Sequence, residues 1–473
     1  MGKIVMVSFL VLVLVMCFGV MAMAMNFDHH DEDWGMDPKE EDWGGQQRGG
    51  HRHWFLLQRS RLLLRTEAGE MRVIRSVGQR MVHKHINVGF LSMEPNSLFI
   101  PQYLDSSVVL FVQTGRANVG LVHRHELGER QLRAGDLYRI PSGSTFYLQN
   151  VGEGQRLELI LSIDTSEGLR MGTLENFFIG GGNYPKSVLA GFDSEVLTSA
   201  FNVSSSELRH VLTRQQQGPI VSLNNSHSSS DLWRKFVSME EQDRLQELRK
   251  LVDLPNEQEQ SQTWSWRKLL NSMFGTIENE KRKQNHHEHA QKAYNLYNRK
   301  PDFKNNYGSS LSVDESDYSP LQNSGIGVYL VNLQAGSMLA PHVNPTATEY
   351  GVVLRGSGHL QIVFPNGTLA MKAKLKPGRV FWVPRYFPFV QVASNNEQLQ
   401  IFGFTTSSQP NRPQFLAGSS SVLEALRGPE LAAAFGVSEG RLNRFVNAQR
   451  EAVILPYNAE RNTKAEGIPM ADW

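Results

Sequence analysis

Two stretches of the chain, residues 55–163 and 325–407, alternate short apolar runs with turn residues. Runs such as SSVVLFVQTG and RLELILSID have the length and the aliphatic content of β-strands. Each stretch is followed, after a loop, by a segment of helical periodicity, at Asp193–Gln215 and Ser421–Gln449. The pattern predicts a mainly β protein with two β-modules, each followed by a small helical extension.

The two stretches are copies of one internal repeat. AGDLYRIPSGSTFYLQN, at Ala134–Asn150, matches PGRVFWVPRYFPFVQVASN, at Pro377–Asn395. The helical segments repeat as well, because SAFNVSSSEL in the first half corresponds to AAFGVSEGRL in the second. A repeated order of strands and helices predicts two similar domains. The match keeps the turn-forming residues in register, namely Gly135 with Gly378 and Pro141 with Pro384.

Six parts of the chain follow from these patterns. Polar, charged composition marks the segments that follow the signal and lie outside the two modules. We expect the acidic segment at 25–54 to be disordered. The expected parts are a signal peptide at 1–24, an acidic segment at 25–54, the N-terminal module with its helices at 55–223, a helix and hydrophilic linker at 224–293, the C-terminal module with its helices at 294–457, and a tail at 458–473.

The N-terminus has the features of an export signal. Lys3 provides a positive charge, residues 4–21 form an apolar core, and Ala22 and Ala24 give an A-x-A cleavage pattern. We therefore expect the mature chain to begin near Met25. An uncleaved membrane anchor is the alternative, but no later stretch is long and apolar enough to span a bilayer, so no membrane association is expected after cleavage.

Cysteine content and charge exclude several kinds of function. The single cysteine, Cys17, lies in the signal, so the mature chain has no disulfide and no thiolate nucleophile or metal ligand. The 48 basic and 47 acidic residues give a formal net charge of +1. This balance argues against nucleic acid as a partner, because binding a polyanion normally needs a basic excess.

A pattern suited to metal binding lies in the second repeat, in APHVNPTATEYGVVLRG at Ala340–Gly356. Residues two apart on a strand share a face, so an H-x-H pair directs two imidazoles to the same side. Here His342 is followed two residues later by Asn344 in place of a second histidine. Glu349 then follows where a carboxylate could add a ligand. The pattern is that of a metal site with one imidazole missing.

This arrangement resembles the two-part cupin signature, G-x5-H-x-H-x4-E-x6-G followed by G-x5-P-x-G-x2-H-x3-N. The second repeat matches the first part from Gly336 to Gly356, except at Asn344. In the second part, Tyr386 replaces the glycine and Phe389 stands where the third histidine belongs. The resemblance implies a cupin barrel that has kept its turns and lost metal ligands.

The first repeat departs further from the cupin signature. Phe146 occupies its histidine position, and Val108 lies seven residues before Gly115, where the glutamate would be. The turn residues of the second signature are all present, so the sequence fits the barrel and not its coordination chemistry. These retained residues are Gly135, Pro141, Gly143 and Asn150.

The similarity becomes more specific in segments such as YNLYNRKPDFKNNYG, at Tyr294–Gly308, and EPNSLFIPQYLDSSVVLFVQTG in the first module. From about Phe55 to Tyr457 the chain resembles the vicilins, the 7S globulins of plant seeds. The resemblance implies two jelly-roll cupin barrels in one chain and a homotrimer held through the helical extensions. It further implies deposition in protein storage vacuoles as a nitrogen and carbon reserve, and some vicilins hold a metal or small anions in their barrels.

We expect no catalytic residue and no required cofactor. At most, a divalent metal would bind weakly in the C-terminal barrel at His342, Glu349 and Asn344, because two good ligands without a third nitrogen rarely hold a catalytic metal. Phe389 would fill the remaining direction with an apolar ring. The alternative is a partly buried His342 paired with Glu349.

Other histidines cluster where we expect no metal site. The histidines in the acidic segment and the linker lack fixed geometry. The HRHE motif lies outside the cupin site, and the adjacent segment LGER is predicted to form a polar hairpin tip. The remaining pair, His83 and His85, lies at the beginning of a predicted strand, and we expect it at the surface or at a sheet edge. These histidines are His29, His30, His51, His53, His83, His85, His123, His125, His286, His287 and His289.

Three sequons for N-glycosylation are present, at Asn202, Asn224 and Asn366. Asn224 opens a polar loop and Asn366 lies in a PNG turn, so both should be exposed. Asn202 lies near a helix start, where it could be hidden.

The leading functional hypothesis is a storage globulin. Its expected partners are further copies of the chain and processing proteases. We expect it to follow the secretory pathway to the storage vacuole or the cell exterior. A metal-dependent bicupin enzyme of the oxalate decarboxylase or dioxygenase type is the first alternative, and it would need three histidines and a glutamate in one barrel. A small-anion-binding cupin is the second alternative.

Overall fold

The computed structural model describes residues 54–57, 59–75, 84–123, 126–169, 174–223 and 291–457. The predicted signal, nearly all of the acidic segment and the linker, and the tail lie outside these residues. The same holds for Asn224 and for all of the clustered histidines except His85 and His123. Within the part of the chain that is described, no helix is long and apolar enough to cross a membrane.

Two sheets form the N-terminal module. The first has the strand order β14-β9-β6-β11-β4-β3-β2, and the second has the order β12-β5-β10-β7-β8 with β13 paired to β5. All the pairs are antiparallel. The strands are β2 (Arg61–Thr66), β3 (Gly69–Ile74), β4 (Ile86–Met93), β5 (Ser97–Leu104), β6 (Ser107–Thr114), β7 (Arg116–His123), β8 (Glu126–Arg133), β9 (Asp136–Ile140), β10 (Phe146–Asn150), β11 (Leu157–Asp164), β12 (Asn176–Phe178), β13 (Ile220–Ser222) and β14 (Tyr294–Asn295).

The C-terminal module repeats this topology strand for strand. Its sheets have the orders β1-β22-β19-β24-β17-β16-β15 and β21-β20-β23-β18-β25, with β26 paired to β18. The repeat read from the sequence is thus confirmed as two copies of one two-sheet architecture. The strands are β1 (Leu56–Leu57), β15 (Phe303–Asn305), β16 (Gly308–Val313), β17 (Gly327–Leu333), β18 (Ser337–Val343), β19 (Glu349–Gly356), β20 (Gly358–Val363), β21 (Leu369–Leu375), β22 (Val380–Val383), β23 (Phe389–Ala393), β24 (Leu399–Thr405), β25 (Gln414–Phe415) and β26 (Ile454–Pro456).

The modules exchange a short strand at equivalent places. β1 comes from the start of the N-terminal module but pairs with β22, where Leu56 lies opposite Phe381. Reciprocally, β14 comes from the start of the C-terminal module and pairs with β9, where Tyr294 lies opposite Leu137. Each exchanged strand satisfies the backbone of a sheet edge that would otherwise be open.

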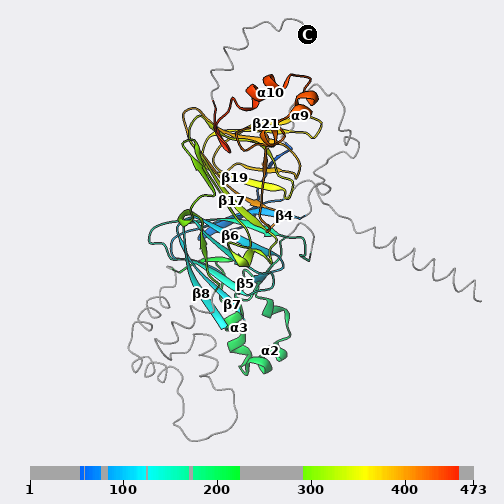
Figure 1. The fold of residues 1–473 in the computed structure, drawn as a ribbon. Coiled ribbons are helices and arrows are strands. Elements are labelled where there is room, and N and C mark those ends of the chain that lie inside the picture. Colours follow the sequence, from blue (N-terminus) through cyan, green and yellow to red (C-terminus); the bar gives the residue numbers. More distant parts are fainter. Residues whose placement is uncertain are drawn as a thin grey trace, which may run out of the picture. The chain divides into compact units, whose positions relative to one another are not determined.

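Short helices follow each barrel (Figure 1). After the first come η2 (Val188–Gly191), α2 (Ser194–Phe201) and α3 (Ser205–Thr213); after the second come α8 (Val422–Ala425), α9 (Pro429–Ala434) and α10 (Glu439–Val446). Two further 3-10 turns, η3 (Leu296–Asn298) and η4 (Ser319–Leu321), lie at the start of the C-terminal module. The segment predicted as helical at 193–215 is broken at Asn202, which has a left-handed φ of 52°. Ser204 then caps α3 by accepting a hydrogen bond from the Glu207 backbone N–H at 3.2 Å.

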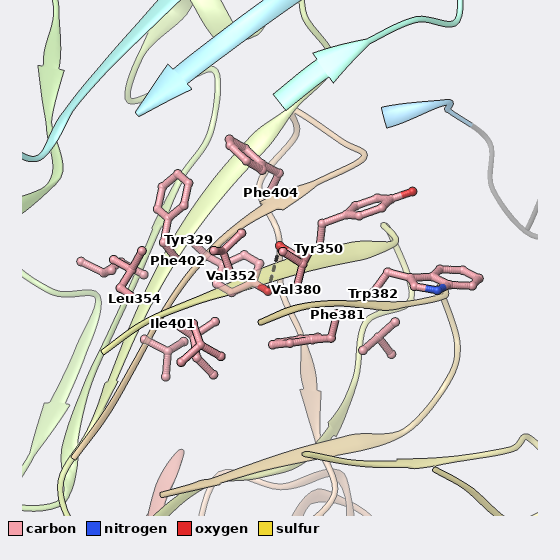
Figure 2. Packing of buried hydrophobic residues seen from close by; sticks show 14 of the residues in the cluster. Tyr329, Tyr350, Val352, Leu354, Val380, Phe381, Trp382, Ile401, Phe402 and Phe404 are labelled. Carbon is pink, nitrogen blue, oxygen red and sulfur yellow. Dashed lines mark hydrogen bonds between the residues drawn. The ribbon is translucent and has the colours of Figure 1, made fainter. Parts of the chain in front are cut away.

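The largest buried cluster joins the two modules. It contains the apolar interior of the C-terminal barrel together with residues of β4, β6, β9 and β11 from the N-terminal barrel. Phe111 of β6 stacks on Phe402 of β24 with ring centroids 4.0 Å apart. Around Phe402, buried aromatic and branched side chains from β17, β19, β22 and β24 interlock (Figure 2), and the Tyr329 hydroxyl donates to the Tyr350 carbonyl at 3.3 Å. The modules therefore share this buried cluster, while the interior of the N-terminal barrel forms a second cluster of its own.

Replacing Phe111 with alanine tests this shared core. The ring is fully buried, so Phe111→Ala should lower the free energy of unfolding by about 3–5 kcal/mol, through lost burial and the cavity left beside Phe402. Urea unfolding checks the change. As a control, Leu369→Ala removes a side chain that is 48% exposed, and should cost less than about 0.5 kcal/mol. Equal effects of the two substitutions would contradict a core that spans both modules.

Candidate functional site

The polar residues of the predicted motif lie inside the C-terminal barrel. His342 is near the end of β18, where it is only 2% exposed. Its backbone is in register with Phe389 of β23 on one side and Phe415 of β25 on the other. The imidazole centroid lies 4.0 Å from the ring of Phe389 and 5.4 Å from that of Phe415. The predicted apolar ring beside His342 is thus confirmed.

Burial holds the imidazole in its neutral form. Loss of hydration lowers the pKa of His342 to about 4, and the hydrogen bond to the Ala340 carbonyl only partly opposes this. Nδ1 lies 2.7 Å from that carbonyl oxygen. Because a carbonyl can only accept, Nδ1 carries the proton and donates, which leaves the lone pair on Nε2.

Asn344 and Glu349 form a separate buried pair. The Asn344 side-chain N–H donates to Glu349 Oε1 at 2.7 Å. Burial raises the pKa of the Glu349 carboxyl to about 7, and the bond from Asn344 offsets only part of this rise. Asn344 Oδ1 already accepts from the Thr346 backbone N–H at 3.0 Å, the Thr346 hydroxyl at 2.9 Å and the Ala347 N–H at 3.0 Å. This oxygen is therefore used to shape the loop before β19.

The prediction that His342 pairs with Glu349 is wrong, because each of these described residues has a different hydrogen-bond partner. His342 is bonded to the Ala340 carbonyl instead, and Glu349 is bonded to Asn344. Burial explains the difference, because it favours the uncharged form of both groups and so removes the attraction that an ion pair needs.

These residues do not fit a resident metal ion. Asn344 has committed its oxygen to backbone and hydroxyl donors, and Phe389 offers no lone pair, so His342 and Glu349 remain as the available donors. A stable site needs three or more protein ligands in fixed geometry. Within the described ranges, no group of three His, Cys, Asp or Glu side chains is arranged to hold one.

The turn that precedes β23 keeps the backbone geometry of the equivalent turn in the N-terminal barrel, without its glycine. Tyr386 has a φ of 75°, in the left-handed region, and the equivalent Gly143 has a φ of 72°. The Tyr386 N–H donates to the Asn344 carbonyl at 3.0 Å, and the Arg385 guanidinium lies 4.6 Å from the Tyr386 ring centroid. Those contacts offset the strain of a left-handed tyrosine beside the site.

In the N-terminal barrel, Gln102 occupies the position of His342. It lies opposite Phe146 of β10 and Phe178 of β12, just as His342 lies opposite Phe389 and Phe415. The sequence reasoning missed Gln102, although the match of Pro101 with Pro341 places it there. The side chain is fully buried, so this barrel also keeps one polar group at the former ligand position.

Comparison with known proteins agrees with this geometry. The cupin family model matches residues 57–209 and 294–441, one match for each barrel. A vicilin-like seed storage protein of Arabidopsis thaliana is 50% identical over 417 residues, which is 86% of this chain and 81% of the relative. The chain belongs to the vicilin-like cupins. The resemblance to the vicilins, with two cupin modules in one chain, is thereby confirmed.

Solved vicilin structures share the fold of this vicilin-like chain. The vicilin of hazelnut, Corylus avellana, superposes with a TM-score of 0.67 at 23% identity and covers 85% of this chain and 99% of its own. The vicilin of Solanum melongena, described as holding different anionic ligands in structurally similar pockets, gives 0.68 at 19% identity over 86% and 98%. The predicted fold class, mainly β with two cupin barrels and small helical extensions, is confirmed.

Both described sequons of the vicilin-like chain are exposed. Asn202 is the C-cap of α2 and lies shortly before the start of α3, as its sequence position suggested, but it is exposed and not hidden. Asn366 lies in the turn between β20 and β21, where its Oδ1 accepts from the Thr368 N–H at 3.1 Å and the Thr368 hydroxyl at 2.7 Å. Glycosylation at Asn202, Asn224 and Asn366 stays a prediction.

Two of the clustered histidines fall on described residues. His123 is exposed at the end of β7, and His85 precedes β4, where its backbone N–H donates to the Ser166 hydroxyl at 3.0 Å. The segment LGER lies within β8. The prediction that LGER forms a hairpin tip is therefore wrong, because these residues pair with β7, where Leu127 lies opposite Val122.

Glu349→Gln tests the buried carboxyl through pH. The pKa of Glu349 is about 7 when folded and near the ordinary value, about 4.3, when unfolded. The folded state therefore binds more protons between these values, and its stability falls as the pH rises through this window. The glutamine variant lacks this loss, so its stability relative to the parent should rise by about 2–3 kcal/mol from about pH 5 to about pH 8.

Urea unfolding at a series of pH values measures this difference. The opposite contribution of His342, which is lost as the pH falls toward about 4, is common to both proteins and cancels. Gln391→Leu, an uncharged change in the same barrel, serves as the control and should show no such slope. A difference for Glu349→Gln that is independent of pH would contradict the buried acid.

Proposed function

We propose that this vicilin-like protein is a seed storage globulin, deposited as oligomers and mobilised by proteolysis. The observation that carries the proposal is the 50% identity to a seed storage protein across both barrels. The interiors support it, because apolar rings fill positions at which a cupin enzyme would hold its metal. What the chain supplies is packed protein mass, with glutamine- and arginine-rich segments that add nitrogen.

The enzyme alternative lacks its ligands in the residues described. An oxalate decarboxylase or dioxygenase of the bicupin type needs three imidazoles and a carboxylate converging in one barrel. The C-terminal barrel offers His342 and Glu349, while the N-terminal barrel has Gln102 and Val108 at the equivalent positions. Anion binding in the C-terminal barrel is not favoured either, because the ionised form of buried Glu349 would repel an anion.

The helical extensions support self-association into a homotrimer. They leave large apolar side chains on the surface, and Phe445 of α10 is 69% exposed. Large apolar side chains exposed on these helices favour a contact surface, and a second copy of the chain carries the same side chains. The exposed side chains on and beside these helices are Phe192, Val196, Phe201, Val211, Leu426, Phe435 and Phe445.

The route and the processing follow from the same proposal. An export signal at 1–24 would direct the chain into the secretory pathway, and the storage vacuole is the compartment proposed for its deposition. Processing proteases are the partners that would open the polar segments and release amino acids for growth.

Seed development tests the storage role. The protein should accumulate to high abundance late in seed filling and decline within days of germination, as measured by quantitative mass spectrometry of seed extracts. A constant low abundance in seeds and leaves alike would contradict a storage role.

Light scattering tests the oligomer. The parent protein at micromolar concentration should have a mass of three chains, whereas the double variant Phe201→Glu/Phe445→Glu should shift to one chain, because burying two charges at an apolar contact is costly. Leu369→Glu, at an exposed residue outside the helices, should leave the trimer intact. A parent protein of monomeric mass would overturn the proposal.

A further inference from the structure

The turn between β20 and β21 contains an asparagine followed by a glycine, Asn366 and Gly367. This is the only Asn-Gly dipeptide in the 473 residues of the chain. Both residues are exposed, and Gly367 has a φ of 84°, in the left-handed region that favours glycine. Apart from its chain neighbours, nothing lies within 4 Å of the place where a Cβ atom of residue 367 would be. The turn is therefore open to water and free of packing contacts at its tip.

Thr368 directs two hydrogen bonds to the side chain of Asn366. Its backbone N–H donates to Asn366 Oδ1 at 3.1 Å, and its hydroxyl donates to the same oxygen at 2.7 Å. Two donors on a carbonyl oxygen stabilise the negative charge that develops there when a nucleophile attacks the carbonyl carbon. Neither bond involves the side-chain nitrogen, Nδ2. The turn thus activates Cγ of the amide and leaves Nδ2 able to depart.

The backbone nitrogen of Gly367 is the nearest nucleophile in the chain. It is joined to Asn366 through the peptide bond, so its attack on Cγ is intramolecular and closes a small ring. Its N–H donates to the Phe364 carbonyl at 2.9 Å, and this bond must open first. Glycine has no side chain to crowd the attacking nitrogen, and the exposed tip can rearrange without moving packed residues. Below the tip, the Phe364 ring packs on Phe55 and Phe387, with centroids 6.5 and 5.9 Å away.

Nδ2 of Asn366 is also the atom to which an N-glycan would be attached, because Asn366, Gly367 and Thr368 form a sequon. We propose that Asn366 is a site of spontaneous deamidation, activated by Thr368, and that glycosylation and loss of ammonia compete for its Nδ2. A chain that carries a glycan at this residue keeps the amide, whereas a chain without one loses it with time.

The reaction consumes only water. Gly367 N forms a bond to Asn366 Cγ and gives its proton to solvent, while the Cγ–Nδ2 bond breaks and Nδ2 takes up a proton and leaves as ammonia. Water then opens the cyclic imide at either of its carbonyl carbons, which yields aspartate or isoaspartate. One water enters for each ammonia released, nothing is oxidised or reduced, and a neutral amide becomes a carboxylate.

Mass spectrometry of the folded, full-length protein tests the proposal. The protein is produced in a bacterial host that adds no N-glycan, and is then incubated at mildly alkaline pH. Asn395 and Asn396, which are exposed between β23 and β24 but have no glycine after them, serve as internal references. Asn366 should lose ammonia at least about tenfold faster than either reference, because its attacking nitrogen is unhindered. Methyl transfer by a protein isoaspartyl methyltransferase should detect isoaspartate beside aspartate.

Two glycine variants separate the Asn-Gly pair from the rest of the protein. Gly367→Ala keeps the sequon and should slow ammonia loss at Asn366 by about tenfold or more, because a methyl group crowds the attacking nitrogen. Gly154→Ala is the matched control, since Gly154 is also exposed, has a φ of 63° and has open surroundings. It should leave the rate at Asn366 unchanged.

Two variants of Thr368 test the activation. Thr368→Ser keeps the hydroxyl donor to Asn366 Oδ1 and should retain the rate of the parent. Thr368→Val lacks the hydroxyl, and should be slower by roughly twofold to tenfold, which corresponds to one hydrogen bond. In a yeast host, the fraction of protein with a glycan at Asn366 should show no ammonia loss at this residue.

Several results would each overturn the proposal. They are a rate at Asn366 no greater than at Asn395 and Asn396, aspartate without isoaspartate, and equal rates for Gly367→Ala and the parent. Equal rates for Thr368→Val and Thr368→Ser would have the same effect, as would a failure to attach a glycan at Asn366 or equal ammonia loss with the glycan in place.

Discussion

A phenylalanine ring occupies the inward position of the third cupin imidazole in both barrels, and much of the interior depends on this. Phe389 lies against His342 at 4.0 Å in the C-terminal barrel, and Phe146 lines the cavity of the N-terminal barrel. An aromatic ring contributes burial and dispersion contacts but no lone pair. The interiors are consequently stabilised mainly by packing, and in the C-terminal barrel His342 is bonded to the backbone while Asn344 is bonded to Glu349.

The same reliance on packing joins the two modules. The chain has a single cysteine, Cys17, so no disulfide within one chain can hold the barrels together. Instead, β1 and β14 are exchanged between the modules, and Phe111 stacks on Phe402 across the shared core. Two barrels that complete each other's sheets suit a protein whose role is to persist until it is consumed.

Much of the architecture could be predicted from the sequence. The repeated glycines and prolines fixed the alignment of the two halves, and the cupin spacing placed His342, Glu349 and Phe389 in one barrel. Hydrophobic periodicity also located the helices, although the break at Asn202 needed the left-handed backbone seen only in the structure.

The polar contacts inside the barrels could not be predicted in the same way. Sequence proximity favoured a bond between His342 and Glu349, but burial makes both groups neutral and each finds a different partner. Gln102 was missed because glutamine is no usual metal ligand, and only the strand register shows that it is equivalent to His342. Spacing identifies positions, whereas hydrogen-bond partners depend on three-dimensional burial.

Elemental analysis of the purified, undialysed protein tests the central claim most directly, namely that side chains and not a metal fill the barrels. Mass-spectrometric metal quantification should find manganese, iron, copper and zinc each well below one atom per chain, and chelator treatment should leave the unfolding temperature unchanged. One atom of a transition metal per barrel, whose removal lowers that temperature, would contradict the account.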